Sequence, residues 1–186
     1  LLGTSHLFTR DVFCFWEDRG EVRMQLKPHA PGIRKFSEQA LTAKARTIIK
    51  SMRASKDSGK AVMFYSCIIG SIPGQTATAI KVADTFVRSL RERLDQVFII
   101  NPAEYFEPGM DGDDLMFMWE QVQRSGLINI WRFQSMEDIE ASFGLMGLKV
   151  PPVWSGKDAT FSTGCTKEMR IALDMQRSHP ELQIVG

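Results

Sequence analysis

The sequence predicts one α/β domain, in which helices cover a mixed or parallel β-sheet. Three short apolar segments, at residues 61–69, 97–100 and 127–133, are rich in branched and aromatic side chains and are only long enough for strands. Segments whose apolar residues recur at helical spacing lie between them. Strands that are apolar on both faces are typical of sheets that helices cover on both sides, so this alternation predicts the fold class.

The beginning of the chain predicts a β-hairpin. Residues 12–16 and 21–26 are strand-like, and residues 17–20 provide the turn between them. Prolines and a glycine within residues 28–32 then interrupt the pattern. We therefore expect an N-terminal hairpin extension over residues 1–32 and an α/β domain over residues 33–186.

Helical periodicity and turn residues place the other elements of the α/β domain. Helices are expected over residues 36–52, 80–94, 113–124, 136–143 and 166–176. The third of these follows a long loop, and its first acids, Asp113 and Asp114, suit the positive end of a helix dipole. Between the last two helices, residues 153–162 are expected to form a second hairpin.

Composition excludes some classes of function. The 23 Lys and Arg residues nearly balance the 22 Asp and Glu residues, so the net charge of +1 offers no bulk field for nucleic acid or an anionic membrane surface. No apolar run is long enough to insert into a membrane. The three cysteines have no CxxC or His/Cys spacing, so we expect no metal and no cofactor, and a disulfide between Cys14 and Cys165 stays open. We expect other proteins as partners.

The end of the chain reads as a strand at residues 128–133, a short helix, the stretch Gly147-Leu148-Lys149-Val150-Pro151, a hairpin and a last helix. This order resembles the second half of a thioredoxin fold. In that family a hydrophobic residue and a cis proline open the strand that faces the active site. The resemblance therefore implies a cis bond at Pro151. The alternative is that Pro151 only starts an edge strand or stiffens a loop.

The middle of the chain narrows this resemblance, because an extra strand and helix lie at residues 97–124. That order is similar to the thioredoxin-like pilus-assembly proteins of F-type conjugative transfer systems, whose Ser-hydrophobic-Pro helix start is matched by Ser71-Ile72-Pro73. The resemblance covers about residues 45–178 and implies a thioredoxin-like mixed sheet with an inserted βα unit. It also implies a periplasmic location and a role in a bacterial conjugation or type IV secretion assembly.

Cys67 is the candidate catalytic residue. It ends the first core strand, just before the helix that carries the redox motif in catalytic thioredoxins, but Gly70 replaces the second cysteine of that motif. We therefore expect a non-catalytic protein-interaction module. The alternative is a monothiol oxidoreductase, which needs Cys67 as a thiolate, whereas a thiol in an apolar run is more often inert.

Two further features suggest binding. The turn at residues 70–76 joins a buried strand to a helix and contains glycines and hydroxyls, as phosphate-binding turns do, so a flavin or nucleotide binder is a further possibility. It matches no glycine-rich fingerprint, and a tight turn with Pro73 near the first helical position is the favoured explanation. The candidate partner-binding residues are aromatic: Tyr105, Phe106, Phe117 and Trp119. They form a protein-binding surface or pack the long loop onto the domain.

Overall fold

The structure is a computed structural model that describes residues 12–14, 24–26 and 36–186. Its contacts divide the chain into two units, Leu1–Arg34 and Lys35–Gly186. In the first unit, β1 (Val12–Cys14) pairs antiparallel with β2 (Met24–Leu26), with Val12 opposite Leu26. This pairing matches the one expected from the sequence, and the expected turn at residues 17–20 lies outside the described residues.

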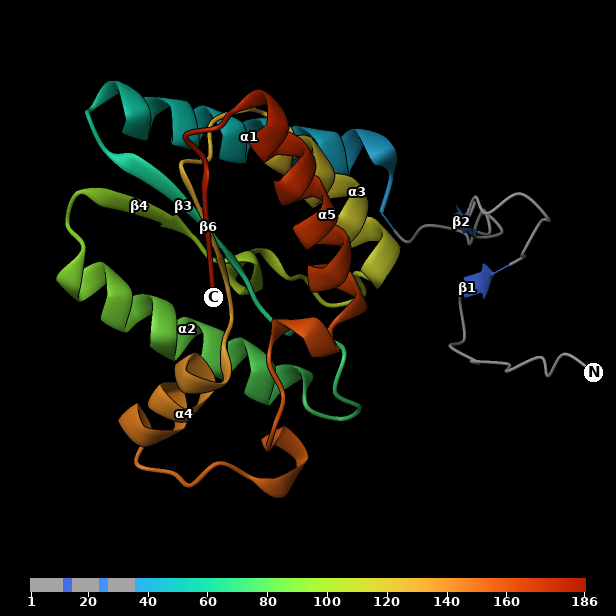
Figure 1. Cartoon of the computed structure of the whole chain (residues 1–186), viewed down its shortest axis with the longest axis vertical. Coiled ribbons are helices and arrows are strands. Elements are labelled where there is room, and N and C mark those ends of the chain that lie inside the picture. Colours follow the sequence, from blue (N-terminus) through green and yellow to red (C-terminus); the bar gives the residue numbers. More distant parts are fainter. Residues whose placement is uncertain (1–11, 15–23, 27–35) are drawn as a thin grey trace, which may run out of the picture. The chain divides into compact units, whose positions relative to one another are not determined.

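The second unit contains a four-stranded sheet in which every strand is parallel to its neighbours (Figure 1). The strands are β3 (Ala61–Ser66), β4 (Val97–Ile100), β5 (Ile130–Phe133) and β6 (Gln183–Val185). Their order across the sheet is β4-β3-β5-β6, so β3 is an inner strand paired on both sides. Met63 of β3 lies opposite Ile99 on one side and Ile130 on the other.

Five helices flank this sheet and make a three-layer unit (Figure 1). One layer holds α1 (Glu38–Asp57), α3 (Gly112–Gln123) and α5 (Thr163–Ser178), and α3 packs against both of the others. The other layer holds α2 (Thr76–Arg93) and α4 (Met136–Leu145). The chain thus winds along the sheet in both directions from β3, which is the doubly wound arrangement of α/β proteins.

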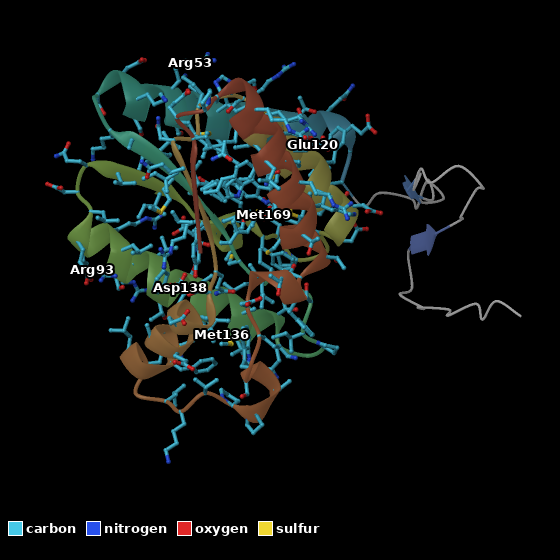
Figure 2. The ribbon with its side chains drawn as sticks, viewed as in Figure 1. Arg53, Arg93, Glu120, Met136, Asp138 and Met169 are labelled. Atoms are coloured by element: carbon cyan, nitrogen blue, oxygen red, sulfur yellow. The ribbon has the colours of Figure 1, made fainter. Side chains whose placement is uncertain are left out.

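The alternation of side chains along β3 explains the two layers of core. Val62 and Phe64 are buried in the cluster that α1, α3 and α5 complete, whereas Met63 and Tyr65 are buried against α2. Met169 of α5, labelled in Figure 2, is partly buried against the first cluster. A strand that is buried on both faces reads as a continuous apolar run, which is why the sequence of residues 61–69 indicates a central strand.

The expected mixed sheet is wrong, because all four strands of this sheet are parallel. The expected second hairpin is absent as well. Residues Pro152–Trp154 and Ala159–Phe161 are short 3₁₀ helices, and the strand that completes the sheet, β6, comes after the last helix. Its three residues alternate between exposed and half-buried, so β6 lacks the apolar run that identifies the other strands.

The expected cis bond at Pro151 is also wrong, because the described residues contain no cis peptide bond. Pro151 has φ −66° and ψ 149° and stands immediately before the first 3₁₀ helix. Its fixed φ suits the entry to that turn, so this proline stiffens a loop, which is the second of the two interpretations that the sequence allows.

Candidate functional site

A cavity of about 430 Å³ lies at the edge of the sheet where the parallel strands end. Three segments line it: the β3–α2 connection, the stretch from Pro102 to Trp119, and the start of α5 from Ser162 to Glu168. We call this space the edge cavity. Ligands of doubly wound proteins bind outside the carboxyl ends of the strands, close to the strand at which the winding reverses. Cys67 follows β3 directly and lines the edge cavity, so the cavity lies at the carboxyl end of this strand.

Local sequence shapes two of these walls. In the β3–α2 connection, Gly74 has a φ of 71°, which favours glycine, and the Gln75 amide donates to the Ile72 carbonyl to close the turn. At the start of α5, the Ser162 hydroxyl accepts from the Cys165 amide as a helix cap and lies 3.0 Å from the Ser71 hydroxyl. This hydroxyl pair joins the two walls.

Most of the wall that the β4–α3 segment provides is apolar. Phe106, Met110, Leu115, Met116 and Trp119 line the cavity there. Asp111 also lines it and begins α3 with a capping box, accepting from the amides of Asp113 and Asp114. The acids at the start of this helix therefore act as helix caps or lie in its first turn, as the sequence predicts.

The charged groups on the cavity walls are acidic. Among the described residues that line the cavity, Asp111 and Glu168 carry carboxyl groups, and Lys, Arg and His do not occur. Such a wall does not favour a polyanion, because bound phosphate groups are normally met by cationic side chains as well as by helix amino ends.

Glu168 is a buried carboxyl group within a hydrogen-bond network. Its side chain accepts from Gln123 Nε2 at 2.8 Å and from Ser66, whose hydroxyl in turn accepts from Trp131 Nε1 at 2.8 Å. Burial raises the pKa of Glu168 to about 7, although the two hydrogen bonds act in the opposite direction. No salt bridge within residues 36–186 reaches it. Glu168 therefore exchanges its proton near neutral pH inside the cavity wall.

Trp119 presents an unused hydrogen-bond donor in the same wall. The residue is 2% exposed, and its indole ring makes edge contacts with Phe64 and Tyr105, with ring centres 5.4 Å apart in each case. Its Nε1 hydrogen has no acceptor among the described residues. A buried donor without a partner costs about 1–3 kcal/mol.

Cys67 lines the edge cavity, together with a second thiol, Cys165. Both are free and buried. Burial raises the pKa of Cys67 well above its ordinary value, and the nearby Cys165 and Glu168 raise it further. The pKa of Cys165 is raised by burial and then by Glu168. Both thiols are therefore held in the protonated form, which is a poor nucleophile.

The candidate partner-binding aromatics gather around the edge cavity. Trp119 and Phe106 line it, Tyr105 packs edge-on against Trp119, and Phe117 is half-buried against the core. Pro151 does not line the cavity. Sequence reasoning missed Glu168, although a signal was present: it occupies the buried stripe of α5 with Cys165, Ile171 and Ala172. An acid on the apolar face of a helix indicates a paired or functional carboxyl group.

Comparisons with known proteins leave the family open. No family model matches the chain, and neither a curated protein nor a solved structure matches it. The resemblance to the conjugative pilus-assembly proteins thus stays a prediction. Within the described residues, the helices include none long and apolar enough to cross a membrane, and the His, Cys, Asp and Glu side chains form no metal-binding group of three.

Proposed function

We propose that the α/β unit binds a small, largely apolar organic molecule in the edge cavity. The observation that carries this proposal is a cavity of about 430 Å³ whose wall is largely apolar, with Phe106, Met116 and Trp119 among its lining residues. Cavities of roughly 300–1,000 Å³ with apolar walls and a few polar groups are typical of small-molecule sites. Thr163 and Gly164, in the first turn of α5, add backbone amides to the same wall.

This site lies where a flavin or nucleotide would be expected, but its chemistry suits a different ligand. The β3–α2 turn does form one wall, as a phosphate-binding turn would. However, the described lining residues offer no cation to a phosphate, and the Asp111 carboxylate would repel one. An uncharged ring system suits the aromatic and methionine side chains better.

Redox catalysis and protein binding find less support in the geometry. A monothiol oxidoreductase needs a thiolate, and burial raises the pKa of Cys67 well above its ordinary value. The protein-interaction module, with or without a conjugation assembly, remains a proposal. Of its four candidate aromatics, Trp119 is buried and the other three are half-buried, so they offer little surface to a protein partner.

Ligand-observed NMR with a fragment set tests the proposed function. The set contains neutral, cationic and anionic ring compounds, with flavin mononucleotide and ATP as polyanionic members. Gly164→Leu is expected to weaken the binding of cavity ligands, because Gly164 lines the cavity and an added Cβ would meet nothing closer than Ser162 Oγ at 3.5 Å. The Cβ of the new side chain would therefore fit without overlapping the protein.

Gly144→Leu is the matched control. Gly144 lies in α4, outside the edge cavity, and a Cβ there would meet no atom within 4 Å. The proposal expects neutral rings to bind the wild-type chain and this control equally, and the Gly164→Leu variant at least about tenfold more weakly. If no fragment distinguishes two folded variants in this way, the proposed function is wrong.

A further inference from the structure

We infer that the ligand of the edge cavity carries a weakly basic ring nitrogen, which shares a proton with the carboxyl group of Glu168. This inference rests on the proposed function and names the chemistry of its ligand. It joins two observations: a cavity with aromatic walls, and a buried carboxyl group in that wall without a cationic partner among the described residues.

The protein holds Glu168 by hydrogen bonds but does not neutralise it. Gln123 of α3 and Ser66 of β3 each donate to its carboxyl group, which fixes its orientation. Gln123 Oε1, in contrast, is a buried acceptor without a donor among the described residues, so this network is incomplete. A buried carboxylate is stable when a cation or further donors meet it, and otherwise keeps its proton.

The groups that surround Glu168 favour a base over an acid. Cys165 on its own helix and Cys67 from the β3–α2 connection are protonated thiols, and Asp111 from the start of α3 adds a negative charge to the wall. None of the described lining residues is a cation. An acidic ligand group near these side chains would meet the negative charge of Asp111, whereas a basic group would meet the Glu168 carboxyl group in either of its protonation states.

The helix amino ends limit how basic the ligand can be. The first turns of α2 and α5 border the cavity at Thr76 and Thr163, and neither turn contains an acid. Their positive ends oppose a permanent cation and favour an acceptor atom. A weakly basic ring nitrogen suits both the Glu168 carboxyl group and the helix amino ends. It is an acceptor when neutral, and it becomes cationic only by taking the proton of Glu168.

The proton transfer is balanced without another reactant. The O–H bond of the Glu168 carboxyl group breaks, an N–H bond forms on the ring, and a carboxylate faces the resulting ring cation. Burial keeps a proton on Glu168 close to neutral pH, since its pKa is about 7. The planar ring itself would pack against Phe106 and Trp119.

Benzimidazole and indole are the two probes that test this inference. They have the same bicyclic shape, but only benzimidazole carries a basic ring nitrogen. By calorimetric titration at pH 7, the wild-type chain is expected to bind benzimidazole about tenfold more tightly than indole. Glu168→Gln should lower the benzimidazole affinity to the level of indole and leave the indole affinity unchanged. Glu140→Gln, an exposed acid of α4, should change neither affinity.

The outcomes separate this inference from the proposed function. Equal binding of the two probes to the wild-type chain, or failure of benzimidazole where another fragment of the set binds, overturns the inference and leaves the proposed function standing. Absence of any fragment that is sensitive to Gly164→Leu overturns both. If Glu168→Gln does not fold, the ¹⁵N shift of labelled benzimidazole bound to the wild-type chain decides, and a ring nitrogen that has gained no proton overturns the inference.

Discussion

At the scale of single residues, the edge cavity depends on groups whose protonation burial controls. Glu168 has its pKa raised from 4.5 to about 7, and the pKa values of Cys67 and Cys165 are raised as well. In each case desolvation of the charged form is the largest cause. Burial therefore favours the protonated, neutral form of these three side chains. The effect can be measured for each of them.

Glu168 is expected to destabilise the fold as the pH rises. The unfolded chain releases this proton near pH 4.5, whereas the folded chain holds it until about pH 7. The wild-type free energy of unfolding, relative to that of Glu168→Gln, should be greatest below pH 4.5 and fall by about 3 kcal/mol by pH 7. Urea unfolding of both chains at several pH values measures it. A difference that does not depend on pH would contradict the raised pKa.

The thiols of Cys67 and Cys165 are expected to be unreactive in the folded chain. In a Cys14→Ser background, Cys67 and Cys165 should react with Ellman's reagent at pH 8 at least about a hundredfold more slowly than in guanidinium chloride, because both are buried and protonated. Mass spectrometry locates any label. Rapid labelling of Cys67 in the folded chain would restore the monothiol mechanism.

Replacing Trp119 is expected to change the stability of the fold and the affinity for ligands for different reasons. Trp119→Phe removes an indole N–H that has no partner in the described residues, so the lost packing is the main cost, about 1–3 kcal/mol. If the ligand accepts from this N–H, the affinity for cavity-binding fragments should fall about tenfold, which NMR titration measures. Unchanged affinity in a folded variant would show that the donor is not used.

At the scale of elements, the start of α4 shows how one acid can complete a helix and join it to the sheet. Asp138, labelled in Figure 2, forms a capping box with Ser135 and accepts two hydrogen bonds from the Arg132 guanidinium of β5. Its side chain is 3% exposed, and the Tyr65 hydroxyl of β3 lies 3.4 Å from it. The short helix at residues 136–145 therefore does not depend on its own propensity.

Asp138→Ala is expected to lower the free energy of unfolding by about 3–5 kcal/mol, because it removes a cap and leaves the guanidinium of Arg132, whose side chain is only 27% exposed, without its partner. Asp174→Ala is the control, since that acid is half exposed in a salt bridge with Arg177 and should cost at most about 1 kcal/mol. Chemical denaturation measures both. Similar losses for the two variants would argue against the role of Asp138.

At the scale of the whole molecule, the described core belongs to the second unit. Its clusters are formed by residues that follow Lys35, on both faces of the parallel sheet. A chain that starts at Lys35 is therefore expected to unfold cooperatively with a midpoint within a few degrees of that of the full chain. Calorimetry of the two chains tests this boundary. A large fall in the midpoint would show that residues 1–34 stabilise the α/β unit.

Local patterns identify most of the elements of the second unit. The apolar run that forms β3 is recognisable because this inner strand is buried on both faces, and the shorter runs of β4 and β5 are recognisable by their branched and aromatic side chains. The helices follow from periodicity, although α5 begins at Thr163, earlier than expected, because Ser162 caps it. The sequence also places Cys67 at the end of β3, and the structure puts that position beside the edge cavity.

By itself, the sequence determined the fold class and the order of its helices and inner strands, since burial and periodicity are properties of neighbouring residues. Only the tertiary structure decided that the sheet is wholly parallel, because β6 is too short and too exposed to leave a pattern. Only the tertiary structure, too, shows which residues meet at the candidate site. Cys67, Trp119 and Glu168 come from segments far apart in the chain, and their meeting depends on where parallel strands end. The chemistry of the edge cavity, with protonated thiols and a carboxyl group that titrates near neutral pH, follows from burial that no local pattern contains.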